Sequence, residues 1–217
     1  KDMKTFFTIW VGQLISMLGS GLTNFALAVW IYDRTKQATP FAITVLLGTI
    51  PRVLLLPVAG SIADRFNRRF IMIAADTLNA LLTLIIFLLL GAGNLQIWHI
   101  YIIAMLESVF SAFQEPAFSA SISTIVPKEK LGSANGMIQM REALSTVITP
   151  ILAGILFVAI GFNGIIMIDF VTFFFAVGAL LLVRIPQPER MPEHKDKNIW
   201  QDMKFGWSYL SERKGLL

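Results

Sequence analysis

Residues 60–69 read GSIADRFNRR and separate two long apolar runs, at about Phe41–Ile62 and Phe70–Leu90. A helix that crosses a membrane needs roughly 20 mostly apolar residues to span the hydrocarbon core. Both runs meet that length, and the basic stretch between them is too short and too charged to lie inside a bilayer. This part of the sequence therefore predicts two membrane-spanning helices joined by a tight basic loop.

The same pattern continues in both directions from this loop. The chain is 55% hydrophobic and only 15% charged, below the roughly 25% charged share of soluble domains. Turn-forming residues separate the apolar runs. We therefore predict an all-α membrane protein with six transmembrane helices, at about Phe6–Ile31, Phe41–Ile62, Phe70–Leu90, Ile97–Phe118, Ser133–Ile160 and Gly164–Val183.

The basic residues predict the orientation of these helices. If the helices alternate in direction, only Arg34 and Lys36 fall on one side of the membrane. The other side holds Lys1, Lys4, Arg65, Arg68, Arg69, Lys128, Lys130 and Arg184. Cytoplasmic loops carry an excess of Lys and Arg, so both ends of the chain are expected inside, with the bundle in the inner (plasma) membrane. Basic residues placed in this way indicate membrane orientation and not nucleic-acid binding.

The character of the sequence changes after the sixth run. Residues 1–184 form the predicted bundle, and residues 185–217 begin with a proline-punctuated, charged linker. Apolar residues then recur at helical spacing at Trp200, Met203, Trp207 and Leu210. This spacing predicts an amphipathic helix in the membrane interface, which would lead into a second half of the protein.

Residues 60–69 closely resemble the signature loop G-x-L-A-D-R-x-G-R-K of the major facilitator superfamily. The departures are Ile62, Asn67 in place of glycine, and Arg69 in place of lysine. We expect Asn67 to keep the turn because asparagine tolerates left-handed backbone. Gly60 would allow close helix packing, and Asp64 would accept hydrogen bonds or pair with an arginine.

The resemblance also implies roles for the basic residues of this loop. They would hold it at the anionic membrane face, and Glu115 would pair with one of them, Arg68, as a gate latch. The gating set expected from the motif is Gly60, Asp64, Arg65, Arg68, Arg69 and Glu115.

The resemblance implies that the chain is the first six-helix half of a twelve-helix transporter, with a second six-helix half as its partner. Within the superfamily, the chain looks most like bacterial efflux permeases that export macrolides and siderophores. The stretches that carry this likeness include RFIMIAAD at 69–76 and AFQEPAF at 112–118. TPILAG at 149–154 resembles a degenerate antiporter motif, in which Pro150 and Gly154 would form a bendable, closely packed seam.

Four charged residues fall near the middle of the predicted spans. A lone charge at the bilayer centre costs about 3 kcal/mol, so such residues normally pair or line water. Arg52, Glu107, Arg141 and Glu142 are therefore expected to form a neutral polar cluster at the central cavity, where a transporter binds its substrate. A purely structural ion-pair network stays open as an alternative. Arg141 and Glu142 are also neighbours, which point about 100° apart on a helix.

Other polar residues in the spans are interpreted as structural. Asp169 is placed close to the outer surface, at a helix junction. Asp76 and Gln13 are expected to hydrogen-bond neighbouring helices.

The function expected from these features is proton-coupled efflux by alternating access, with the proton gradient as the energy source and no bound cofactor. Glu107 or Glu142 would carry the proton, and Phe- and Leu-rich walls would select an amphipathic or lipophilic small molecule. The alternatives are uptake, lipid movement, a non-transporting membrane scaffold or sensor, and a six-span homodimer. The chain has no cysteine, and neither a nucleotide loop, a nucleophile with its base nor metal-ligand spacing occurs, so neither an enzyme nor a metal site is expected.

Overall fold

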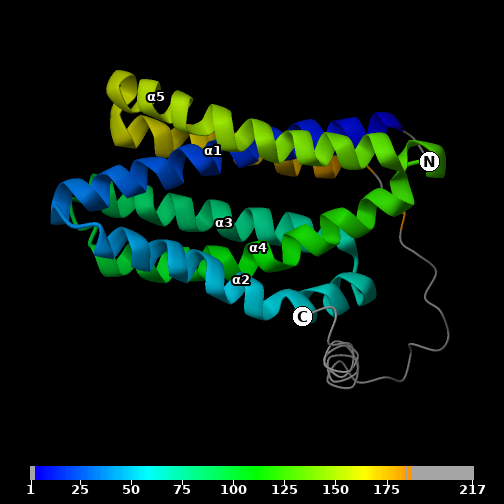
Figure 1. The fold of residues 1–217 in the computed structure, drawn as a ribbon, viewed down its shortest axis with the longest axis horizontal. Helices are drawn as coiled ribbons and strands as arrows, with labels where there is room; N and C mark the ends of the chain where they lie inside the picture. The colour runs from blue at the N-terminus through cyan, green and yellow to red at the C-terminus, as the bar shows by residue number, and fades with distance from the viewer. Residues whose placement is uncertain (1–2, 184, 187–217) are drawn as a thin grey trace.

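The computed structural model describes residues 3–183, 185 and 186. These residues form long helices that run along one common axis, and none of them lies in a β-strand (Figure 1). The elements are α1 (Met3–Thr35), α2 (Thr39–Arg65), α3 (Arg68–Gly91), α4 (Ile97–Ile125), the short 3₁₀ helix η1 (Lys128–Lys130) and α5 (Leu131–Leu182). The predicted all-α membrane architecture is confirmed. Outside Ile185 and Pro186, the predicted linker and interfacial helix at 185–217 lie outside the described residues.

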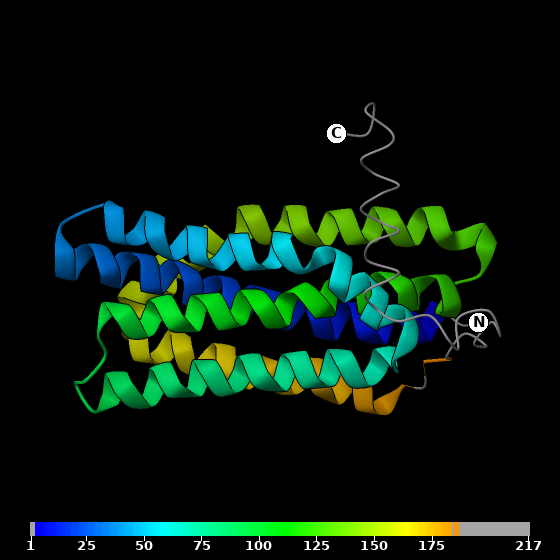
Figure 2. The ribbon, with the colours of Figure 1, turned by 90° about the horizontal axis from the view of Figure 1, so that it is seen from below.

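The longest helix, α5, supplies two of the six predicted spans. It has 52 residues, which at about 1.5 Å per residue would extend for about 78 Å, more than twice the thickness of a hydrocarbon core. Gly161 breaks it with φ 69° and ψ −177°, a backbone conformation that glycine adopts without steric cost. The chain reverses there, and the second arm (residues 162–182) runs back toward the end where the first arm (131–160) began (Figure 2).

The signature loop is reduced to two residues between helices, Phe66 and Asn67. Asn67 has φ −64° and ψ 109°, and its side chain accepts a hydrogen bond from the backbone N–H of Phe70. The expectation of left-handed backbone at Asn67 is therefore wrong. Asparagine serves here as the N-cap of α3, a position that it favours because its side chain pairs with a free N–H of the first helical turn.

Close packing in the bundle is concentrated between α1 and α5. A Cβ added at Gly12 would lie 2.6 Å from the Ala179 Cβ and 2.9 Å from the Phe175 carbonyl oxygen, so only glycine allows this approach. By contrast, no described atom comes within 4 Å of a Cβ added at Gly60 or Gly154. The close packing predicted at Gly60 and Gly154 is therefore wrong for the helices that the structure describes.

Pro150, expected to make α5 bendable, keeps helical backbone angles in this structure. Pro150 is inside α5, and the non-helical backbone in this helix is at Gly161. In the described part of the chain, the seam expected from Pro150 and Gly154 thus lacks its tight contact, and its ability to bend stays a prediction.

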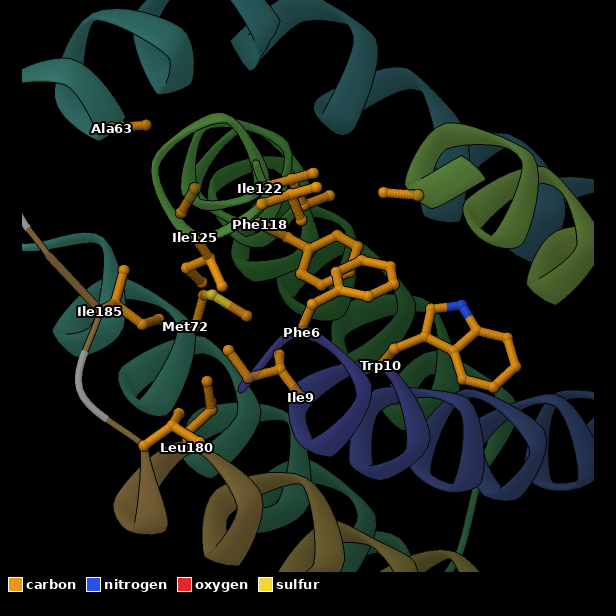
Figure 3. Close-up of a cluster of buried hydrophobic side chains, with 14 residues drawn as sticks. Phe6, Ile9, Trp10, Ala63, Met72, Phe118, Ile122, Ile125, Leu180 and Ile185 are labelled. Atoms are coloured by element: carbon orange, nitrogen blue, oxygen red, sulfur yellow. The ribbon is translucent and has the colours of Figure 1, made fainter. Parts of the chain in front are cut away.

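Two apolar clusters stabilise the ends of the bundle. One lies where α1 begins and α4 ends (Figure 3), and it includes Phe6, Ile9, Trp10, Met72, Phe118, Ile122, Ile125, Leu180 and Ile185. The other lies toward the opposite end and includes Leu27, Ile31, Ile86, Ile100, Ile103 and Ile166. Buried polar side chains occupy the depth between them, among them Gln13, Asp76, Thr83, Ser108 and Asp169. This polar layer positions the candidate site.

Candidate functional site

A polar cavity of about 390 Å³ opens at this depth, and α1 to α5 all contribute to its wall. Most of its lining side chains are polar, and its apolar side chains include Met17, Phe118 and Phe173. Its charged residues are five carboxylates and two guanidiniums: Asp76, Glu107, Glu115, Glu142, Asp169, Arg52 and Arg141. We call this space the central cavity.

All four charged residues predicted at mid-depth line the central cavity. Arg141 and Glu142 both reach it although they are adjacent in sequence, because the cavity is wide enough to meet two faces of α5. Two other expectations are wrong. The charges do not sum to zero, since Asp76, Glu115 and Asp169 add three carboxylates. The walls are also not rich in Phe and Leu, because most large apolar side chains face outward or pack in the end clusters.

An ion pair joins α2 to α4 at the cavity wall. The Arg52 guanidinium contacts the Glu115 carboxylate, and both side chains are almost half exposed. The backbone N–H of Arg52 also donates to the Ser108 Oγ at 3.0 Å. Glu115 therefore pairs with Arg52, where the sequence led us to expect Arg68.

The Asp76 carboxylate joins three helices through two glutamine side chains. Its Oδ2 accepts a hydrogen bond from the Gln13 Nε2 at 2.9 Å, and its Oδ1 accepts one from the Gln114 Nε2. The Gln114 Nε2 also donates to the Gln13 Oε1 at 3.0 Å. Since both carboxylate oxygens face donors, this cluster ties α1, α3 and α4 together in the buried polar layer.

The Asp169 carboxylate makes a second cross-link of the same kind. Its Oδ1 accepts a hydrogen bond from the Ser20 Oγ at 3.1 Å, and its Oδ2 accepts one from the Thr83 Oγ1 at 3.3 Å. Asp169 is only 5% exposed and lines the central cavity. Its predicted place near the outer surface is wrong, because its arm of α5 starts directly after Gly161 and carries Asp169 about 12 Å inward.

Glu107 differs from these carboxylates. Its side chain lies in the cavity wall, half-buried, and no hydrogen-bond or ion-pair partner is found for it among the residues that the structure describes. Glu142 has no such side-chain partner in that part of the chain either, but it is exposed. Glu107 is therefore an inward-facing acid whose proton can come and go without breaking a helix–helix bond.

Arg141 has an incompletely satisfied guanidinium. Its Cζ lies 4.8 Å from the centroid of the Phe118 ring, a cation–π contact. Its Nε is buried, and within the described ranges it has no hydrogen-bond partner. The Phe118 ring thus covers one face of the Arg141 guanidinium. The Nε–H of Arg141 has no acceptor among the described residues.

The arginines of the signature loop bind backbone carbonyls of neighbouring helices. Arg68 is buried and donates to the carbonyl oxygens of Ala63 and Ala120, at 3.3 and 2.7 Å, and it lies 3.7 Å from the exposed Asp64 carboxylate. Arg69 donates to the last carbonyls of α5, those of Leu180 at 2.6 Å and Leu181 at 2.8 Å. The contacts to Ala63, Leu180 and Leu181 satisfy carbonyls that a helix end leaves free, whereas the Ala120 carbonyl lies inside α4.

A regular pattern in the sequence could have revealed more of the site. Gln13, Ser16, Ser20 and Asn24 recur at three- and four-residue steps, which places them on one face of α1, and all four line the central cavity. Gln114, seven residues after Glu107 on the same face of α4, was not anticipated. No group of three or more acidic or histidine side chains suited to a metal occurs in the described residues.

The chain matches the family model described as Major Facilitator Superfamily over residues 9–217. It is 31% identical to macrolide efflux protein A of Streptococcus pyogenes over 97% of this chain and 52% of that protein. It is 32% identical to macrolide efflux protein A of Enterococcus faecalis over 79% of this chain and 53% of the relative. It is 26% identical to the enterobactin exporter EntS of Shigella flexneri over 94% of this chain and 50% of the relative.

The chain thus spans about half the length of the curated relatives it matches. The resemblance seen in the signature loop and in the efflux-permease stretches is confirmed. Together with five long apolar helices around a polar cavity, the last of them turned back on itself at Gly161, these matches show that the chain belongs to the Major Facilitator Superfamily of membrane transporters.

Proposed function

We propose that this chain forms one half of a proton-coupled exporter that moves amphipathic small molecules by alternating access. The bundle would lie in the plasma membrane with both ends cytoplasmic, and a second six-helix half would complete the central cavity. The exporters among the relatives support the direction of transport. The positive-inside distribution of basic residues supports the orientation.

The observation that carries the proposal is the unpaired carboxylate of Glu107 in the cavity wall. Among the other carboxylates of the cavity wall, Asp76 binds two glutamines, Asp169 binds two hydroxyls and Glu115 binds Arg52, while Glu142 is unpaired like Glu107 but exposed. Neutralising Asp76 or Glu115 would cost a hydrogen bond or an ion pair between helices, because the partner atoms of these two carboxylates can only donate. Glu107 can bind and release a proton without that cost, which suits a group that must change its charge in every transport cycle.

The residues that line the cavity indicate the chemical class of the substrate. Polar side chains dominate the wall, and an excess of carboxylates lies beside apolar surface from Met17, Phe118 and Phe173. A purely lipophilic molecule would leave the polar groups without hydrogen-bond partners. The substrate is therefore amphipathic, with polar groups that face the acid-rich wall.

The test is transport by the protein in proteoliposomes with an imposed pH gradient, with a labelled macrolide and labelled enterobactin as the first substrates. Glu107→Gln keeps the size of the side chain but fixes it as neutral. Gradient-driven efflux should be lost, while exchange of substrate without net proton movement should persist. Glu142→Gln is the matched control and should keep coupled efflux.

The same variants separate coupling from a structural role. Because Glu107 has no partner in the described structure, Glu107→Gln should leave the thermal unfolding temperature unchanged. Coupled efflux that survives in Glu107→Gln would refute the assigned role. Loss of coupling in Glu142→Gln alone would move the role to Glu142.

A further inference from the structure

A second, smaller space lies next to the central cavity, between α1, α2 and α4. It has a volume of about 30 Å³, and we call it the side pocket. A cavity needs roughly 10–15 Å³ of this kind of volume to hold one water molecule, so the side pocket has room for a water and little more.

The side pocket begins at Glu107 and leads toward the end of the bundle that carries the α1–α2 and α3–α4 loops. Asn24 and Glu107 line both the side pocket and the central cavity. The other end of the side pocket is formed by Ile31, Ile100 and Phe41, the last of which is 41% exposed. Ile100 precedes Glu107 by seven residues on one face of α4, so the side pocket covers about 10 Å of depth.

Three polar groups with unused hydrogen-bonding capacity meet at this space. The Glu107 carboxylate and the Asn24 amide have no hydrogen-bond partner among the described side chains and backbone. The Thr44 Oγ1 donates to the Pro40 carbonyl oxygen at 2.9 Å, which leaves its lone pairs free to accept. A buried water typically needs two to four polar partners, and three polar side chains line the side pocket.

We propose that the side pocket holds a water that delivers protons to Glu107 from the loop end of the bundle, by a route separate from the substrate's. A hydronium proton passes through this water to a Glu107 carboxylate oxygen, which leaves a carboxylic acid and a neutral water. For release, the Glu107 carboxylic acid gives its proton to a water in the central cavity, which leaves a carboxylate and a hydronium ion there. This inference rests on the proposed coupling role of Glu107.

The surroundings of Glu107 fit two separate routes. The other charged groups near it, including Asp169 on α5 and the Arg52–Glu115 pair, belong to the central cavity and do not line the side pocket. Apart from Glu107, Asn24 and Thr44, the side pocket is lined by apolar side chains. A substrate cannot enter a space of one water, whereas a proton can cross it by exchange between hydrogen-bonded oxygens.

The test uses substitutions that alter the side pocket without touching the central cavity. Thr44→Val removes the hydroxyl and keeps the shape, and its matched control is Thr49→Val, an exposed threonine on the same helix that makes the same type of bond to the Val45 carbonyl oxygen. Ala28→Leu adds three carbons to the side pocket, and its control is Ala42→Leu on exposed surface of α2. In proteoliposomes, Thr44→Val and Ala28→Leu should slow gradient-driven efflux about tenfold, because the water loses a partner or its space. Substrate exchange and both controls should match wild type.

The outcomes separate this inference from the proposed function. If wild type is proton-coupled and Thr44→Val and Ala28→Leu behave like their controls, the side pocket is not the proton route. If they slow exchange as strongly as gradient-driven efflux, the route is not separate from that of the substrate, and the inference is overturned. Wild-type efflux that ignores the pH gradient would refute the coupling itself, and the side-pocket route with it.

Discussion

In the hydrogen-bond cluster of Asp76, Gln13 and Gln114, the carboxylate and the amide should be exchangeable between positions 76 and 13. Two substitutions that destabilise the protein singly should then be tolerated together. In Asp76→Asn, one carboxylate oxygen becomes an NH₂ group that faces a glutamine NH₂, and such a lost buried hydrogen bond costs about 1–3 kcal/mol. In Gln13→Glu, the donor that lies 2.9 Å from the Asp76 Oδ2 becomes a carboxylate oxygen. Two facing carboxylates without a donor between them should cost about 3 kcal/mol or more.

The double variant Asp76→Asn with Gln13→Glu should recover most of this loss. The new amide at position 76 can donate to the new carboxylate at position 13. The Gln114 Nε2, which already contacts both side chains, can donate to an oxygen on each of them. Every donor then faces an acceptor, so the two substitutions should be non-additive by at least about 2 kcal/mol.

Thermal unfolding of the purified protein in detergent measures this effect. A destabilisation of 1 kcal/mol shifts Tm by about 2–4 °C for a chain of this size. Asp76→Asn should therefore lower Tm by about 2–12 °C, Gln13→Glu by about 6 °C or more, and the double variant by about 4 °C or less. The control pairs Gln13→Glu with Asp169→Asn, because Asp169 bonds to Ser20 and Thr83 instead. That combination should be additive. Additive losses in the Asp76 pair as well would refute the cluster.

Other predictions follow from the packing and the loops. Gly12→Ala should destabilise the protein by about 1–3 kcal/mol through overpacking against α5, whereas Gly178→Ala, with no described atom within 4 Å of the added Cβ, should not; equal thermal shifts would contradict this. The chain has no native cysteine, so a cysteine at Gln37 should react with an impermeant thiol reagent added outside cells and one at Asn67 should not; the reverse pattern would invert the orientation. The Asp64→Asn protein should insert and fold normally but transport much more slowly, because the contact between the Asp64 carboxylate and Arg68 is lost. Normal turnover would mean that the motif sets only the orientation of the helices in the membrane.

The number and depth of the spans could be predicted because bilayer thickness fixes their length. Each predicted run lies in a helix of the structure, and Gly161 falls in a predicted break. The fourth helix extends past the predicted Phe118 to Ile125, since its last turns are too polar to count as a membrane run but still pack in the bundle.

The rotation of each helix about its axis could not be predicted. The position of Glu115 along its helix shows its depth, at which several basic side chains could reach it. Which of them pairs with Glu115 depends on how the helices pack, and in the structure it is Arg52. The arginines of the signature loop show the same limit. Their charge predicts a membrane surface, while the structure turns Arg68 and Arg69 toward backbone carbonyls. Side chains compete for partners in three dimensions, and a single sequence does not record which partner wins.

The division of the carboxylates into bonded and unbonded groups bears on how a proton would drive transport. A ligand shifts a conformational equilibrium only through a difference in its interactions with the two states. Protonation of Glu107 breaks no described bond between the helices of this half, whereas Asp76 and Asp169 cross-link α1, α3, α4 and α5 whatever the state of Glu107. On the proposed mechanism, this half would therefore move as a rigid body. The energetic difference that protonation makes would then come from groups outside this half, because Glu107 lines the central cavity and would meet substrate or the second half there.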